Sequence, residues 1–205
     1  MIIQNFLGYI NMNTITQNAV VFIIYAAACM NAFADIQPSG VPDMKLSSPA
    51  FKHLSRSQSP QAKYTPADGD EDSSIPVQYT CKGADISPEL RIDGIPANTK
   101  SLALIMDDPD APVGTFVHWL IWNIPPDTKT LDKGQRPPGI QGLTDFGKRG
   151  YGGPCPPSGI HRYYFKLYVL DTTLDIPNHS NKSDLVHAMQ DHIIGKAELI
   201  GLFKR

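Results

Sequence analysis

Charged residues are few in this sequence and nearly balanced, which argues against two classes of partner. The 205 residues contain 18 Lys and Arg against 20 Asp and Glu, so the formal net charge is −2. A chain so close to neutrality has no general electrostatic attraction for nucleic acid or for an anionic membrane surface. We therefore expect no nucleic-acid partner, and any anion that this protein binds must be held by the local geometry of a site.

Lys, Arg, Asp and Glu are absent altogether from the first 34 residues. Residues 19–30 form an apolar run that is too short to cross a bilayer but suits the hydrophobic region of a signal peptide. An A-x-A cleavage pattern follows at residues 32–34. We predict a signal peptide over residues 1–34 and a mature protein that begins near Asp35, does not span the membrane and is periplasmic or secreted. Because the leader also lacks a basic residue, a buried helix, a membrane anchor and a lipoprotein attached at Cys29 remain as alternatives.

Cysteine is rare as well. The chain contains three, and the one at position 29 lies within the predicted leader. The mature protein would therefore keep Cys81 and Cys155. An even number of cysteines in an oxidising compartment allows one disulfide but does not require it.

Sequence motifs of several common enzyme and cofactor-binding classes are missing. The chain has no G-x-S-x-G nucleophile elbow, no H-E-x-x-H zinc motif and no dinucleotide-binding or P-loop fingerprint. The acidic stretch at residues 68–72 begins like a calcium loop but lacks the required glycine and the bidentate glutamate. We expect a protein that is not an enzyme and that carries no metal or cofactor. One enzymatic alternative stays open, a hydrolase with Cys155 as nucleophile and His161 as base.

What the sequence does contain is a set of strand patterns. Residues 101–107 are an almost continuous apolar run, and residues 116–124 are rich in β-branched and aromatic side chains, so both predict strands buried on two faces. Residues 162–171 alternate, and residues 196–203 predict a last strand. In the alternating segment one face carries Tyr163, Phe165, Leu167 and Val169, and the other carries Arg162 and Lys166.

Helix signals are confined to the end of the chain. Ser183 is expected to cap a helix that runs to about residue 194. Its apolar stripe would consist of Leu185, Val186, Met189 and Ile193. The 18 prolines oppose long helices elsewhere. We predict a mostly β domain over residues 44–205 with one or two late helices, a polar lead-in at residues 35–43 and an exposed loop insertion at residues 52–74.

Three short segments concentrate polar residues beside the predicted strands. Asp107, Asp108 and Asp110 follow the first strand among prolines, and His118 interrupts an apolar strand. The stretch 150–163 is rich in Gly and Pro and ends with a second histidine and a tyrosine. Taken singly, these are also typical of an Asp-Pro turn, a core histidine and a rigid turn. Taken together, imidazoles, a hydroxyl and glycine N–H groups offer the donors that an oxyanion needs.

The same segments resemble a known family. Residues 108–112 (DPDAP) and 153–157 (GPCPP), the latter followed by HRY at 161–163, resemble in order and spacing the two ligand-binding signatures of the phosphatidylethanolamine-binding protein family. His118 stands where that family has its first pocket histidine. Residues 79–90 and the tail resemble the bacterial branch, often called Raf-kinase-inhibitor-like proteins. The resemblance covers roughly residues 44–205, although the loop after residue 52 looks longer than in bacterial relatives, and Asp191 replaces a frequent glycine.

The resemblance implies a fold and a site. The fold would be a large antiparallel sheet packed on a smaller one, with Greek-key connections and flanking helices. The site would be a small pocket for phosphate, phosphorylethanolamine-like and other anionic groups. Its expected lining is Asp108, His118, His161 and Tyr163, with Gly153 and Pro154 as wall and with Asp110 and Arg162 as support from behind.

These residues favour an exported, non-enzymatic binding protein, with a regulatory role as one option. The alternative is a secreted protease inhibitor, or a modulator of host or partner proteins, in which the loop at residues 52–74 contacts the protein partner. For the two cysteines of the mature chain, at positions 81 and 155, a disulfide is expected because both flank pocket-forming loops.

Overall fold

The structure, a computed structural model, describes residues 44–54 and 73–205. Pro42–Arg205 form one compact unit. The predicted leader and residues 55–72 of the predicted loop insertion lie outside the described residues, as does the acidic stretch that begins like a calcium loop. In the part of the chain that is described, no helix is long and apolar enough to cross a membrane.

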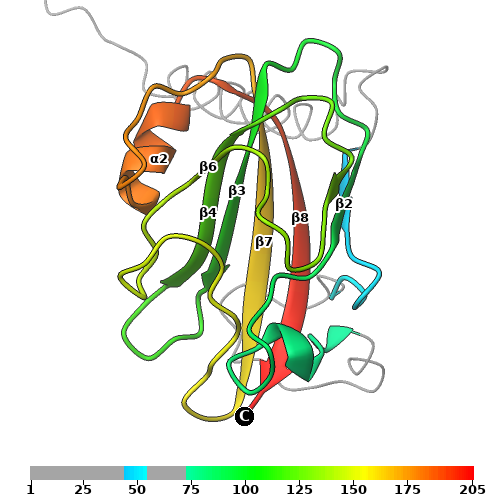
Figure 1. The fold of residues 1–205 in the computed structure, drawn as a ribbon, viewed down its shortest axis with the longest axis vertical. Coiled ribbons are helices and arrows are strands. Elements are labelled where there is room, and N and C mark those ends of the chain that lie inside the picture. The colour runs from blue at the N-terminus through cyan, green and yellow to red at the C-terminus, as the bar shows by residue number, and fades with distance from the viewer. Residues whose placement is uncertain (1–43, 55–72) are drawn as a thin grey trace, which may run out of the picture. The chain divides into compact units, whose positions relative to one another are not determined.

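Two antiparallel sheets make up the described unit (Figure 1), which confirms the predicted mostly β fold class. The small sheet has the order β1-β2-β5, with strands Lys45–Ser47, Leu90–Asp93 and Thr130–Leu131. The large sheet has the order β6-β4-β3-β7-β8, with strands Ile140–Gln141, Phe116–Ile124, Ser101–Asp108, Ile160–Leu170 and Ile193–Lys204. A short 3-10 helix, η2 (Val77–Tyr79), and a single α-helix, α2 (Lys182–Met189), complete the described elements.

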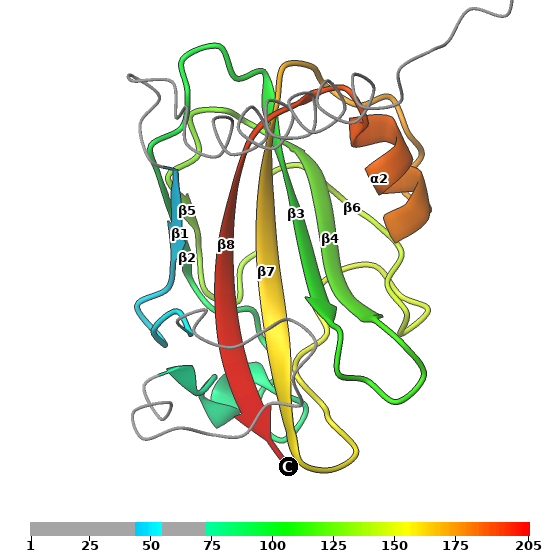
Figure 2. The same cartoon turned by 180° about the vertical axis from the view of Figure 1, so that it is seen from behind.

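Strand β3 lies in the middle of the large sheet and is buried on both faces, as its apolar run predicts. It pairs with β4 on one side and with β7 on the other. Alternate residues of β3 serve two different cores. Leu104 and Met106 belong to the core shared with the small sheet, whereas Ala103 and Ile105 belong to the core shared with α2. The small sheet and the helix therefore cover opposite faces of the large sheet (Figure 2).

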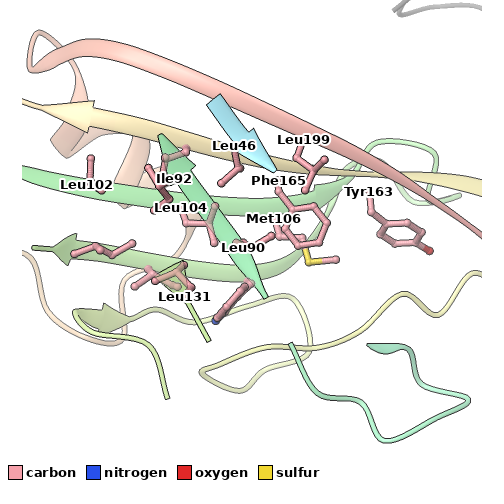
Figure 3. Close-up of a cluster of buried hydrophobic side chains, with 14 of the residues drawn as sticks. Leu46, Leu90, Ile92, Leu102, Leu104, Met106, Leu131, Tyr163, Phe165 and Leu199 are labelled. Atoms are coloured by element: carbon pink, nitrogen blue, oxygen red, sulfur yellow. The ribbon is translucent and has the colours of Figure 1, made fainter. Parts of the chain in front are cut away.

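The core between the two sheets supplies the main apolar burial (Figure 3). Side chains of the small sheet meet those of the large sheet there, and full burial of one such side chain contributes roughly 1.5–3 kcal/mol. The labelled members are Leu46, Leu90, Ile92, Leu102, Leu104, Met106, Leu131, Tyr163, Phe165 and Leu199. The face of β7 that was predicted from its alternation is the face that enters this core.

Helix α2 begins and ends earlier than the sequence predicted, so the expected span 183–194 is wrong at both ends. Asn181, and not Ser183, is the N-cap: its side chain accepts hydrogen bonds from the N–H groups of Ser183 and Asp184, and its own backbone N–H donates to the Asp184 carboxylate. The helix ends at Met189, and Asp191 adopts a left-handed φ of 66°. Such a residue stops an α-helix, a position that glycine fills most easily.

The early helix end also changes the predicted apolar stripe. Leu185 and Met189 are buried against the large sheet, whereas Val186 is 47% exposed. Ile193 lies in β8 and not in the helix, and it is 45% exposed. Two apolar side chains therefore anchor α2 in place of the predicted four.

We predict that Asn181→Ala destabilises the protein by about 1 kcal/mol, the usual cost of losing an N-cap side chain. Ser183→Ala is the matched control, because Ser183 contributes only its backbone N–H to the cap. Urea unfolding of both variants measures the difference. Equal destabilisation by the two substitutions would show that the cap is not at Asn181.

A buried ion cluster joins α2 to the large sheet. Asp107, near the end of β3, is completely buried. Its carboxylate accepts hydrogen bonds from the Lys166 ammonium of β7 at 2.7 and 3.0 Å. The Lys182 ammonium, from the first residue of α2, donates to the same carboxylate at 2.5 Å. Both lysine side chains keep about 30% exposure, so the cluster reaches from the interior to the surface.

Candidate functional site

The predicted site segments converge because the long strands are antiparallel. Asp108 at the end of β3 pairs with Phe116 at the start of β4, and β7 begins beside them with residues 160–163. The loop after β3 and the Gly- and Pro-rich stretch before β7 therefore meet at one end of the large sheet (Figure 2). Sequence signals more than forty residues apart become neighbours there.

A small cavity of about 170 Å³ lies at this end of the sheet. Three of the predicted pocket residues, Asp108, His118 and His161, line it. The full lining consists of Asp108, Ala111, Pro112, Val113, Phe116, His118, Phe146, Cys155, Pro156, Pro157 and His161. The cavity thus has two imidazoles and one carboxylate among mostly apolar side chains.

Asp108 and His161 form a buried pair in which the carboxylate orients the imidazole. His161 Nδ1 lies 2.7 Å from Asp108 Oδ2, and both residues are less than 10% exposed. The other carboxylate oxygen of Asp108 accepts the backbone N–H of Asp110 at 2.8 Å. Because both oxygens of Asp108 have partners in the protein, its role is to hold His161 with Nδ1 engaged and Nε2 left for another interaction.

His118 is fixed in a similar way by backbone. Its Nδ1 donates to the Gly152 carbonyl at 2.8 Å, and the Gly152 N–H donates back to the His118 carbonyl at 3.0 Å. Burial lowers the pKa of His118 below its usual value, although the Gly152 carbonyl and the Asp108 charge oppose the shift. The imidazole is therefore neutral at pH 7, and an anion that binds beside it would favour its protonation.

Aromatic rings enclose His118. The rings of Phe116, Phe146 and Tyr163 lie with centroids 5.2 Å from the imidazole, all in edge-to-face geometry. Phe146 also packs against Phe116 at 4.9 Å. Sequence reasoning missed Phe146, and the signal that could have found it is an aromatic residue inside a long Gly- and Pro-rich loop.

Tyr163, the fourth residue of the predicted lining, lies near the start of β7. It is fully buried in the core between the sheets and does not line the cavity. Within the described part of the chain its hydroxyl has no hydrogen-bond partner. Burial, together with the negative charge of Asp108, raises the pKa of Tyr163 well above its usual value. Its ring packs edge-to-face on His118, and its hydroxyl lies close to Asp108 and to the Cys155 backbone, which belong to the lining.

Gly153 and Pro154, which were predicted as the wall of the pocket, are not among the residues that line this cavity. The Gly153 N–H donates to Asp85 Oδ1 at 2.6 Å, and the Pro154 carbonyl accepts from the Cys81 N–H at 3.2 Å. A Cβ at position 153 would collide with the Tyr79 carbonyl and the Asp85 carboxylate. The missing side chain therefore makes room for a neighbouring loop of the protein and not for a ligand.

Asp110 and Arg162, which were predicted to support the pocket from behind, lie outside the cavity lining. Arg162 donates to the two Asp110 oxygens from Nε at 2.8 Å and from a terminal nitrogen at 2.6 Å, and its backbone N–H adds a third bond at 2.9 Å. Although burial raises the pKa of Asp110, the hydrogen bonds and charge of Arg162 outweigh it and lower the pKa below the usual value. The pair ties the loop after β3 to the start of β7, and so holds Asp108 against His161.

Cys81 and Cys155 are joined by a disulfide, with Cα atoms 5.4 Å apart. The distance lies within the range that a disulfide requires. Cys155 belongs to the cavity wall, so the bond connects the site to the turn after η2. In this oxidised form Cys155 has no free thiol, which removes the nucleophile from the hydrolase alternative. No cluster of three or more His, Cys, Asp or Glu side chains suited to a metal ion occurs within residues 44–54 and 73–205.

Comparison with known proteins identifies the family. The family model described as phosphatidylethanolamine-binding protein matches residues 65–204. This chain belongs to the phosphatidylethanolamine-binding protein family. The resemblance carried by the DPDAP and GPCPP segments is thereby confirmed.

Sequence relatives of this family member include several UPF0098 proteins. A UPF0098 protein from Methanothermobacter thermautotrophicus is 54% identical over 137 residues, which cover 64% of this chain and 91% of that protein. A UPF0098 protein from Aquifex aeolicus is 48% identical over 139 residues, which cover 64% of this chain and 81% of that protein.

Two solved structures share the fold. A phosphatidylethanolamine-binding protein homolog from Chlamydia trachomatis superimposes with a TM-score of 0.68 at 36% identity, covering 79% of this chain and 97% of that one. E. coli YbcL, described as a new member of the mammalian family, has a TM-score of 0.66 at 27% identity and covers 79% and 98%. Both support the two-sheet architecture.

Proposed function

We propose that this family member is a non-enzymatic binding protein whose cavity holds the anionic group of a small phosphate-containing ligand. The observation that carries the proposal is the pair of histidines in one cavity, each with Nδ1 already engaged by an acceptor of the protein. In the protonated state each imidazole can donate its second N–H to an oxyanion. His118 and His161 would thus supply the two charged donors of the site.

The size and surroundings of the cavity suit a compact anion. Its volume of about 170 Å³ is below the roughly 300–1,000 Å³ of sites for drug-sized ligands. Most of the lining is apolar, including Pro112, Phe146 and Pro156, so few groups of the protein compete with an anion for the two imidazoles. A charge-assisted hydrogen bond in such surroundings contributes roughly 1.5–3 kcal/mol. Two such bonds are enough for measurable binding of an anion by a protein with no net positive charge.

Non-enzymatic function is part of the proposal because the lining offers no activated nucleophile. Cys155 is bonded to Cys81, and the lining has no serine, threonine or lysine. The Asp108 carboxylate is fully engaged with His161 and with the Asp110 N–H. The site is therefore built to hold an anion and not to transfer a group from it.

Calorimetric titration of the wild-type protein with inorganic phosphate, sulfate and phosphorylethanolamine tests the proposal. We expect saturable binding with one anion per chain. Choline serves as the control, because it is a cation of similar size and lacks the oxyanion. No heat of binding for any of the anions, with the protein folded by circular dichroism, would contradict the proposed function.

We also propose that the protein is exported, on the basis of the uncharged leader and the A-x-A pattern before Asp35. The expected result is a mature chain that begins at or near Asp35 and is recovered from the periplasm or the medium. N-terminal sequencing of fractionated protein measures this. A full-length chain in the cytosolic fraction would contradict export, and a mature chain that starts with lipid-modified Cys29 would favour the lipoprotein alternative.

A further inference from the structure

The disulfide in the cavity wall is accessible. Both Cys81 and Cys155 are exposed, and Cys155 lines the cavity together with His118 and His161. Exchange of a disulfide with a thiol requires that a thiolate reach one of its sulfur atoms, so exposed disulfides are the labile ones. Of the two cysteines, Cys155 is the one that a molecule in the cavity would meet.

The cavity wall is held in place by more than this disulfide. Three hydrogen bonds connect the same two loops independently of the sulfur atoms. They run from the Cys81 N–H to the Pro154 carbonyl at 3.2 Å, from the Gly153 N–H to Asp85 Oδ1 at 2.6 Å and from the Tyr151 hydroxyl to the Tyr79 carbonyl at 2.7 Å. The prolines on both sides of Cys155 restrict its backbone further. Cleavage of the disulfide is therefore expected to leave the wall in position.

We propose that Cys155 is a thiol-exchange site within the cavity and that its substrates are small thiols that carry an oxyanion. The proposal rests on the proposed anion-binding function. The oxyanion would bind to the imidazoles of His118 and His161, and the thiolate of the same molecule would attack the Cys155 sulfur.

The exchange step is balanced without an additional oxidant or reductant. A bond forms between the sulfur of the bound thiolate and Cys155 Sγ, while the bond between Cys155 Sγ and Cys81 Sγ breaks. The electron pair of the broken bond leaves with the Cys81 sulfur, and the resulting thiolate takes a proton from water. The product carries a mixed disulfide on Cys155 and a free thiol on Cys81.

The test compares two thiols on the oxidised full chain. 2-Mercaptoethanesulfonate and 2-mercaptoethanol have the same thiol arm, but only the first ends in an oxyanion. At equal thiolate concentration we expect the sulfonate to react about tenfold faster or more, the factor that one charge-assisted hydrogen bond provides. Mass spectrometry of intact protein gives the rates, and peptide mapping is expected to place the adduct on Cys155. Added inorganic phosphate should slow the reaction of 2-mercaptoethanesulfonate and leave the reaction of 2-mercaptoethanol unchanged.

Two variants distinguish a reaction that depends on binding of the oxyanion by the cavity histidines from a reaction that depends only on the exposure of the disulfide. His161→Ala should lower the ratio of the rate with the sulfonate to the rate with 2-mercaptoethanol. His192→Ala should keep the preference, because His192 is paired with Asp171 at the far end of β7. Equal rates for the two thiols on wild-type protein, or an adduct on Cys81, would overturn the proposal.

Phosphate binding, measured by calorimetry on the same preparation, shows which inference has failed. If phosphate binds and the two thiols react equally fast, thiol exchange in the cavity is wrong and anion binding stands. If phosphate does not bind, the proposed function is wrong, and the proposed preference for anionic thiols, which depends on it, is wrong as well.

Discussion

His161→Ala is expected to weaken phosphate binding by about tenfold or more, at one factor of ten per roughly 1.4 kcal/mol. The substitution removes one imidazole donor and leaves the Asp108 carboxylate, which is now paired with His161, facing the anion without that partner. The fold should survive because Asp110 and Arg162 still tie the same loops together. Calorimetric titration with phosphate measures the loss, and circular dichroism checks the fold.

The wild-type affinity for an oxyanion should rise as the pH falls. Burial lowers the pKa of His118, so its imidazole is neutral at pH 7.5 in the free protein, and a bound anion stabilises the protonated form. Binding then takes up a proton and strengthens with acidity, by up to about tenfold per pH unit for one proton. Sulfate is the appropriate probe, because it does not titrate between pH 5.5 and 7.5 as phosphate does.

His192→Ala is the matched control for the His161→Ala substitution and for the pH dependence. Its imidazole also pairs with an aspartate, Asp171, at 2.9 Å, but it is exposed and lies at the other end of β7. The control should bind sulfate and phosphate like wild type at both pH values. If His161→Ala does the same, the cavity histidines are structural and the anion site is wrong.

The double substitution Lys166→Met with Lys182→Met is expected to destabilise the protein by about 3–5 kcal/mol, the cost of leaving a buried charge without a partner. Asp107 is completely buried, and these two ammonium groups are its ion-pair partners in the described part of the chain. Urea unfolding measures the change in the free energy of unfolding. Each single substitution should cost clearly less, because one lysine remains.

Replacement of the carboxylate identifies the cause of that loss. Asp107→Leu in the background of the two methionine substitutions should recover most of the stability, since a buried ion cluster can be exchanged for apolar side chains of similar volume at little cost. If the triple variant is as unstable as the double one, the loss comes from the lysine side chains and their packing. The unpaired carboxylate would then not be the cause.

The strands of the large sheet and the family could be predicted from the sequence, because their signals are local. The apolar run 101–107 has the composition of a strand buried on two faces, and the alternation after residue 162 marks the core-facing side of β7. The DPDAP and GPCPP segments are short and contiguous, so their order and spacing can be read directly. Of the predicted pocket residues, Asp108, His118 and His161 came together because β3, β4 and β7 are antiparallel and present these ends at one edge.

Most of the remaining features depend on contacts between segments that are far apart in the chain, and these only the tertiary structure decided. The Gly153 N–H binds Asp85, 68 residues away, and so faces a neighbouring loop instead of the cavity. The Tyr163 side chain follows the alternation of β7 into the core, and Phe146 enters the site from a loop without periodicity. For the cap of α2 the sequence offered two nearby polar residues, Asn181 and Ser183. Asn181 is the cap because its side chain accepts hydrogen bonds from two backbone N–H groups at the start of the helix. The sequence thus determined which residues belong to strands and to the family signatures, whereas the direction of each polar group at the site was set by the partner that packing placed beside it.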